Sequence, residues 1–198
     1  MAQLSLHALR VSPSPRPGIG ESGLDELSVA MRFAAGDCRA FEQLLSVYWR
    51  PVLALSTRLL HDSEAADDVA QETFLRVWIN RASIQPGQLR AYIFRVARNL
   101  IVDEARKRDV RAQAIGIPLP MPADRLAERA EQHEAIKHAL DALPPRRREA
   151  FILAYLHELS YKEIAEVLGV SAATVKNHVA SALVDLRRSL AEHAHPFA

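Results

Sequence analysis

Apolar side chains recur at every third or fourth position from about residue 24 to residue 110, which is the period of an amphipathic helix. Turn-forming residues interrupt this pattern at Gly36-Asp37, at His61-Asp62-Ser63 and at Pro86-Gly87. The pattern therefore predicts four helices, over about residues 25–35, 39–60, 63–80 and 88–110. We expect Asp25 to cap the first helix, Ser63 to cap the third, and Pro51 to kink or break the second.

Two stretches lack helical periodicity. Residues 1–25 include SPSPRPG at positions 12–18 and predict a disordered tail. Residues 112–128 include one glycine and three prolines within seven positions, and they predict an extended linker. Helical periodicity returns between about residues 127 and 193. The sequence thus predicts an all-α fold with two small helical domains, residues 26–111 and 129–193, joined by the Pro-rich linker.

The second domain contains the pattern of a helix-turn-helix. Ser160 and Glu163 have the spacing of a capping box at the start of a short helix. Gly169 stands where that helix ends, at a position that favours a left-handed backbone, and Ser171 is placed to cap the next helix. A helix, a short turn with glycine and a second helix are typical of this motif.

The second helix of this motif has one apolar and one polar face. The apolar stripe consists of Val175, Val179, Ala182, Leu183 and Leu186. The opposite face carries Thr174, Asn177, His178 and Ser181, with Lys176 beside them. Polar, hydrogen-bonding residues on such a helix fit insertion into the major groove of DNA. The alternative is an ordinary helical hairpin with a solvated face. The preceding run at residues 146–148, three arginines, is either a solvated helix start or a contact for DNA phosphates.

The first domain carries an acidic and a basic helix. Residues 62–72 contain five acidic residues and no basic one. Asp68, Gln71, Glu72 and Leu75 form one stripe on this helix, which we call the acidic stripe. DNA would repel such a surface, whereas a protein partner with basic side chains would be attracted to it.

The basic helix lies within residues 86–111, which contain seven basic and three acidic residues. Tyr92 and Phe94 stand near Arg95, Arg98 and Asn99. Aromatic rings stack on bases and arginines contact phosphates, so this composition suits single-stranded nucleic acid. The alternative is that Tyr92 and Phe94 belong to the hydrophobic core.

Composition excludes several classes of protein. The single cysteine, Cys38, allows neither an internal disulfide framework nor a cysteine-based zinc site, and it fits a reducing, cytoplasmic setting. The apolar runs are too short to span a bilayer, and no signal peptide is recognisable. No phosphate-binding glycine loop, metal-ligand spacing or nucleophile motif is present, so we expect no enzyme and no cofactor.

Three segments resemble the bacterial sigma-70 superfamily. DDVAQETFLRVW at residues 67–78 is similar to its core-polymerase-binding segment, and LRAYIFRVARNLIVD at residues 89–103 to its promoter-melting, −10-reading segment. LPPR at 143–146, REAF at 148–151 and SYKEIAEVLGVSAATVKNH at 160–178 resemble its −35-reading domain. Two domains with a short linker are the layout of the extracytoplasmic-function (ECF) group. Residues 67–77 and 148–153 further resemble its iron-starvation, ferric-siderophore branch.

The resemblance implies an RNA polymerase sigma factor that binds the β′ clamp helices and the β flap of the core enzyme, and promoter DNA. It also implies an anti-sigma partner, often membrane-anchored, and no small-molecule substrate. The implied core-binding residues are Asp68, Gln71, Glu72 and Leu75. The loop at residues 80–89 would capture a flipped base. The implied −10 contacts are Asn80, Tyr92, Phe94, Arg95, Arg98, Asn99 and Arg106. The implied −35 contacts are Arg148, Ser171, Thr174, Lys176, Asn177, His178 and Ser181.

The main alternative is a two-domain regulator that binds duplex DNA but not polymerase. Such a regulator has no use for Asp68, Gln71 and Glu72 beside Leu75.

Overall fold

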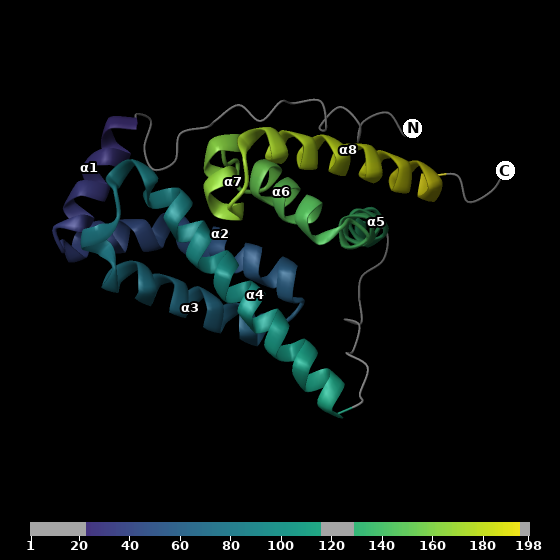
Figure 1. Ribbon diagram of the computed structural model, residues 1–198, viewed down its shortest axis with the longest axis horizontal. Helices are drawn as coiled ribbons and strands as arrows, with labels where there is room; N and C mark the ends of the chain where they lie inside the picture. Colours follow the sequence, from purple (N-terminus) through teal and green to yellow (C-terminus); the bar gives the residue numbers. More distant parts are fainter. Residues whose placement is uncertain (1–22, 116–128, 195–198) are drawn as a thin grey trace. The chain divides into compact units, whose positions relative to one another are not determined.

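The computed structural model describes residues 23–115 and 129–194, which lie in two compact units (Figure 1). Regular structure in both ranges is helical, which confirms the all-α fold class. The N-terminal unit consists of α1 (Gly23–Ala34), α2 (Cys38–Leu60), α3 (Ser63–Ile79), the 3-10 turns η2 (Arg81–Ser83) and η3 (Pro86–Gln88), and α4 (Leu89–Ile115). The C-terminal unit consists of α5 (Arg129–Asp141), α6 (Pro145–Tyr155), α7 (Tyr161–Leu168) and α8 (Ala172–Ala194). Most of the predicted tail and linker lies outside the described residues.

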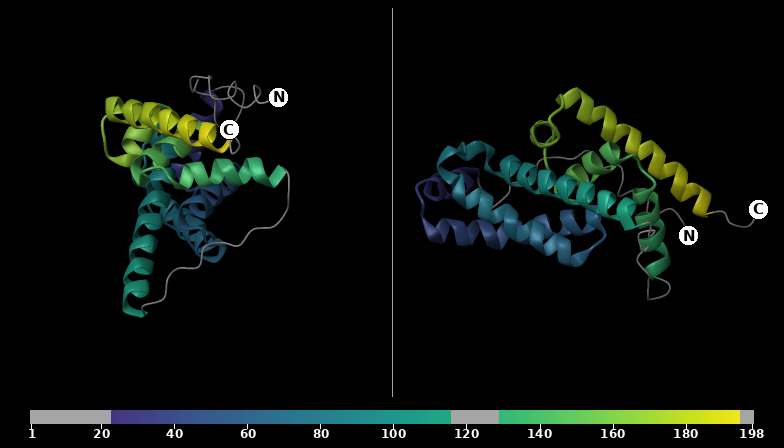
Figure 2. Two further views of the ribbon diagram at one scale, coloured as in Figure 1. Left: turned by 90° about the vertical axis from the view of Figure 1, so that its right-hand side faces the viewer. Right: turned by 60° about the horizontal axis from the view of Figure 1, so that its bottom comes forward.

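The core of the N-terminal unit forms where α2, α3 and α4 pack against one another (Figures 1 and 2). Each helix contributes one apolar stripe with the period predicted from the sequence. The largest buried side chains include Leu44, Leu55, Phe74, Val77, Ile93 and Phe94. Helix α1 packs on α2 and against the turns η2 and η3. The outward faces of α3 and α4 are therefore fixed by what their inward faces bury.

Three helix boundaries differ from the predicted ones. Asp25 lies inside α1, which begins at Gly23, so it is not the cap. Helix α2 runs unbroken through Pro51, because Tyr48 and Val52 on either side of it are buried and tertiary packing holds the helix together. The cap of α3 is Asp62 rather than Ser63: its carboxylate accepts a hydrogen bond of 3.0 Å from the Ala65 amide.

Asp62 also joins the α2–α3 turn to α4. The guanidinium of Arg108 lies 2.5 Å from the Asp62 carboxylate and donates to the Leu60 carbonyl at 3.2 Å. The carboxylate therefore accepts bonds from the Ala65 amide and from Arg108. Both favour its charged form and lower the pKa of Asp62 below the ordinary value of 3.8.

The C-terminal unit builds the predicted helix-turn-helix from α7 and α8. Ser160 and Glu163 form both halves of the capping box, and Gly169 ends α7 in the left-handed region at φ 67°. The Ser171 hydroxyl accepts a hydrogen bond from the Thr174 amide at 3.1 Å, as expected of the cap of α8. Ile164, Val167, Val175 and Val179 are buried on the inner faces of the two helices.

Within the described ranges, no single helix is long and apolar enough to cross a membrane. The bent pair of α7 and Ala172–Ala191 of α8 meets the criterion jointly, by length and composition only, across a 100° bend.

We expect Asp62→Ala to lower the free energy of unfolding of the N-terminal unit by about 1 kcal/mol at neutral pH, because the α3 cap and the Arg108 contact are both lost. A carboxyl with a lowered pKa stabilises the fold above its ordinary value and loses that effect as pH falls through its folded-state value. The difference from the wild type should therefore shrink below about pH 3.8. Urea titrations at several pH values test this, with the exposed Asp67→Ala as control. A pH-independent difference would contradict it.

Candidate functional site

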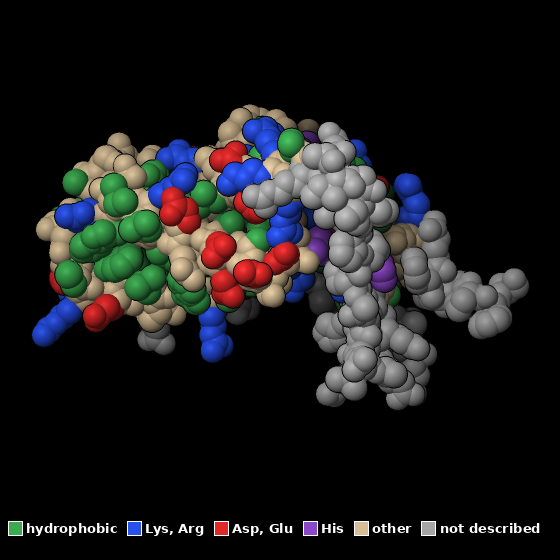
Figure 3. Space-filling model, turned by 90° about the horizontal axis from the view of Figure 1, so that it is seen from below, with side chains coloured by type: hydrophobic (Ala, Val, Ile, Leu, Met, Phe, Trp, Pro, Cys, Tyr) green, Lys and Arg blue, Asp and Glu red, His purple; other side chains and the backbone are tan. Residues whose placement is uncertain are grey.

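The outer face of α3 is exposed and combines acidic with apolar side chains. Asp68 and Gln71 are exposed and Glu72 is partly exposed. Leu75 is 53% exposed and Ile79, one turn later, is 64% exposed. In Figure 3, acidic side chains gather near one end of α3 and hydrophobic ones near the other. Ile79 thus continues the exposed face of α3 beyond the acidic stripe. Its position four residues after Leu75 could have identified it from the sequence.

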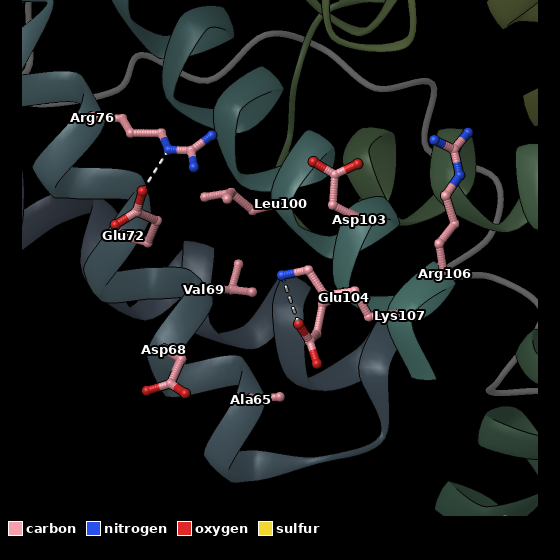
Figure 4. A pocket seen from close by; sticks show the side chains of 10 residues that line it. All are labelled: Ala65, Asp68, Val69, Glu72, Arg76, Leu100, Asp103, Glu104, Arg106 and Lys107. Atoms are coloured by element: carbon pink, nitrogen blue, oxygen red, sulfur yellow. Dashed lines mark hydrogen bonds and ion pairs between the residues drawn. The ribbon is translucent and has the colours of Figure 1, made fainter. Parts of the chain in front are cut away.

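A groove of about 650 Å³ lies between α3 and α4, beside the acidic stripe (Figure 4). Asp68 and Glu72 line it from α3, and Asp103 and Glu104 line it from α4. Basic side chains also line it, namely Arg76, Arg106 and Lys107. Two of these are paired: Arg76 with Glu72 at 2.6 Å and Lys107 with Glu104 at 3.5 Å. The sequence did not predict Asp103 and Glu104 at this site, because the helix that carries them is basic overall.

A second exposed surface lies on α4. Arg95 and Asn99 are exposed, while Tyr92 and Arg98 are partly exposed. The Arg95 guanidinium carbon lies 5.1 Å from the centre of the Tyr92 ring, which is a cation–π contact. Arg106 is exposed further along α4 and lines the groove described above.

Phe94 is not part of this surface. It is 1% exposed and meets the Tyr48 ring edge-on, with 6.5 Å between the ring centres. The prediction that Phe94 contacts nucleic acid is therefore wrong. Residues two positions apart on a helix point in nearly opposite directions, so Tyr92 and Phe94 cannot share one face.

The α3–α4 loop, residues 80–88, contains η2 and η3. The exposed Asn80 ends α3, and its side-chain amide donates to the Arg76 carbonyl at 2.9 Å. Ile84 and Leu89 are buried and anchor the loop. Ser83, Gln85 and Gln88 are exposed between these anchors. The loop is thus a short, fixed segment with polar side chains toward solvent.

The outer face of α8 carries the predicted polar residues. Ser171, Lys176 and Asn177 are exposed, and Thr174, His178 and Ser181 are partly exposed. The Ser171 and Thr174 hydroxyls lie 2.8 Å apart, so part of their hydrogen-bonding capacity is used within the cap. Lys176 and Asn177 are the most exposed of the remaining polar side chains, and His178 and Ser181 lie partly exposed beside them.

Arg148 does not belong with this surface. Its side chain is 19% exposed, lies 3.4 Å from the Asp141 carboxylate, and donates to the carbonyls of Asp141 and Leu143. It ties the end of α5 to α6, and the prediction of Arg148 as a DNA contact is wrong for that reason. Arg147 pairs with Asp185 of α8 at 2.7 Å. Of the arginine run, Arg146 is the most exposed, at 54% of its side chain.

Two family models match the chain. The model for sigma-70 region 2 matches residues 44–111, and the model for sigma-70 region 4 matches residues 133–186. The first therefore covers α3, the loop and most of α4, and the second covers the helix-turn-helix.

Curated proteins and solved structures agree with these matches. The chain is 34% identical to the ferric citrate uptake sigma factor FecI of Escherichia coli, over 72% of this chain and 86% of that protein. It is also 34% identical to the ECF RNA polymerase sigma factor SigE of Mycolicibacterium smegmatis, over 81% of this chain and 66% of that protein. The sigma factor RpoE of Bartonella quintana, solved with the anti-sigma factor NepR, is 28% identical with a TM-score of 0.67, over 76% and 96% of the two chains. The chain belongs to the ECF group of RNA polymerase sigma factors.

The two aromatic residues of α4 should differ in their effect on stability. Phe94→Ala removes a fully buried ring and should lower the free energy of unfolding by about 3–5 kcal/mol. Tyr92→Ala removes a partly exposed ring and should lower it by about 1 kcal/mol or less. Chemical denaturation of both variants tests this, and equal losses would contradict the assignment of the two rings.

Proposed function

We propose that this chain directs core RNA polymerase to promoters through three separate surfaces, and that it performs no catalysis of its own. The domain at residues 26–111 binds the core enzyme through α3 and the opened −10 strand through α4 and the α3–α4 loop. The domain at residues 129–193 binds the −35 duplex through α8. The observation that carries this proposal is the opposite character of the exposed faces of α3 and α4.

The acidic stripe supports the polymerase contact. Asp68 and Glu72 are unsuited to DNA, because a phosphate backbone repels carboxylates. The exposed Leu75 and Ile79 add apolar area that a protein partner would bury. A basic helical pair with apolar side chains, such as the β′ clamp helices, has the matching chemistry. A regulator that binds DNA alone leaves this combination unexplained.

The α4 surface supports the contact with the opened strand. Tyr92 is partly exposed with the Arg95 guanidinium over its ring, and Arg98 and Asn99 lie on the same side of the helix. Unstacked bases bind to aromatic and guanidinium planes, and phosphates bind to the cations. The α3–α4 loop directly precedes α4 and presents exposed polar side chains, which suits the capture of a flipped base.

The α8 surface supports the contact with duplex DNA. Lys176, Asn177 and His178 project from a helix whose other face is buried, so the helix position is fixed while its polar edge is free. Asparagine can donate and accept at the edge of one base, and lysine contacts guanine or phosphate. Arg146 is the most exposed cation of the arginine run, lies 3.8 Å from the Glu149 carboxylate, and is the member of the run that could contact phosphates.

We further propose a cytoplasmic protein that an anti-sigma factor holds inactive. Support comes from the RpoE structure, in which that protein is bound to the anti-sigma factor NepR. The similarity to FecI supports a role in the response to iron or ferric siderophores.

Reversal of charge on the acidic stripe tests the polymerase contact. Asp68→Arg should strongly reduce co-purification with core polymerase, and Asp68→Arg combined with Glu72→Arg should abolish it, because attraction becomes repulsion. The matched control is Asp67→Arg, which makes the same change on the same helix about 100° around its axis and outside the groove. Wild-type recovery of core enzyme by the folded double variant would overturn the proposal.

Substitutions on the two DNA-binding surfaces should impair different steps of promoter recognition. Asn177→Ala should weaken binding of a duplex promoter by about 1–3 kcal/mol, the range for a bidentate base contact, and leave strand opening intact once bound. Tyr92→Ala should spare closed-complex formation and slow strand opening. Permanganate footprinting of the melted bubble, with filter binding of the duplex, separates the two effects. If the Tyr92 variant opened promoter DNA at the wild-type rate, the proposed contact of Tyr92 with the −10 strand would be wrong.

A further inference from the structure

One arginine of the α3–α4 loop, Arg81, is only partly exposed and packs against other parts of the domain. The guanidinium carbon of Arg81 lies 4.5 Å from the centre of the Trp78 ring, which is a cation–π contact. The same side chain donates a hydrogen bond of 3.0 Å to the Trp78 carbonyl. Arg81 thus holds both the ring and the backbone of the last turn of α3.

The other side of this arginine faces the α1–α2 turn. A Cβ atom added to Gly36 would lie 3.5 Å from the Arg81 Nε, so the turn passes directly beside the guanidinium. Gly36 has φ +90°, a conformation that glycine adopts readily and other residues rarely do. Arg81 therefore lies between the Trp78 ring and the backbone of a turn from a different part of the chain.

Trp78 itself belongs to an aromatic cluster that joins three helices. Its ring centre lies 4.9 Å from that of Phe41 on α2 and 6.0 Å from that of Phe33 on α1. The Phe33 and Phe41 rings stack at 5.8 Å. Arg81 is thus attached to the part of the domain where α1, α2 and α3 meet. Helix α1 also packs against both 3-10 turns of the loop.

We propose that Arg81 is a positioning residue for the α3–α4 loop, which fixes where the exposed loop side chains meet the −10 strand. The inference rests on the proposed function of this loop in base capture. Arg81 begins η2, and the Ile84 amide bonds to its carbonyl at 3.3 Å, so an anchored Arg81 sets the path of the next three residues. Ser83 and Gln85 on this path are exposed, whereas Arg81 is turned toward Trp78.

This role differs from that of a phosphate-binding arginine in a measurable way. Loss of a phosphate contact weakens binding about equally for all sequences and lowers the salt dependence by about one charge. Loss of a positioning contact removes no phosphate contact but misplaces the groups that read the base. It should therefore reduce discrimination between bases and leave the salt dependence unchanged.

The test uses holoenzyme assembled from core polymerase and the full chain, with a pool of random-sequence single-stranded oligonucleotides as probe. Sequences enriched by the wild type define its preferred bases, and affinities for single-base variants of them define its discrimination. Arg81→Met should reduce that discrimination by between about 2-fold and 30-fold, the range that corresponds to one cation–π contact. Arg81→Lys, which keeps the cation, should fall between Arg81→Met and the wild type. The control Arg58→Met removes an exposed arginine at the far end of α2 and should change nothing.

A second substitution tests whether Arg81 acts through Trp78. Trp78→Leu should also reduce discrimination, and combining it with Arg81→Met should add little, because both remove the same contact. Thermal unfolding of each variant confirms that the domain is folded.

Unchanged discrimination in Arg81→Met, or a uniform loss of affinity with a lower salt dependence, would overturn the role of Arg81 and leave the proposed function intact. A wild-type holoenzyme that enriches no base would instead overturn the proposed role of the loop, and the role of Arg81 with it.

Discussion

The burial of one face of each of α2, α3 and α4 in a single small core is the constraint on which the N-terminal unit depends. Val69, Phe74 and Val77 turn one side of α3 inward, so Asp68, Gln71 and Leu75 must face solvent. Ile93, Phe94 and Ala97 do the same for α4, so Arg95 and Asn99 are directed outward. The core thereby directs an acidic surface on α3 and a basic surface on α4 toward solvent within one domain. Each surface attracts partners of the opposite charge.

The same logic applies to the C-terminal unit on a smaller scale. The capping box at Ser160, the left-handed Gly169 and the cap at Ser171 fix where α7 ends and α8 begins. Because Val175 and Val179 are buried, the polar edge with Lys176 and Asn177 is presented in one orientation. Ion pairs such as Arg147 with Asp185 then attach α6 to α8. A rigid helix with a free polar edge suits recognition of duplex DNA.

The sequence correctly predicted the features of the fold that depend on residues close together in the chain. The helices, the capping box, the glycine at the end of α7 and the outward face of α3 all follow from periodicity and cap chemistry. The wrong predictions concern side chains whose partners lie on another element of the fold. The cap of α3 was predicted at Ser63 instead of Asp62. Nothing in the neighbouring sequence indicated that Asp62 also binds Arg108, 46 residues away. Composition alone grouped Phe94 with Tyr92 and Arg95, whereas helix geometry places Phe94 nearly opposite Tyr92 and toward the core. The arginine run gave no sign that Arg148 faces the end of α5.

The central claim is that three surfaces of one chain meet three different partners. Photo-cross-linking in a promoter complex of the holoenzyme tests it most directly, with a photoreactive amino acid placed in turn at Gln71, Asn99 and Asn177, all exposed. The account predicts that the probe at position 71 labels a polymerase subunit, the probe at 99 labels the non-template strand of the opened DNA, and the probe at 177 labels the upstream duplex. Labelling of DNA from position 71, or of the same DNA segment from positions 99 and 177, would contradict it.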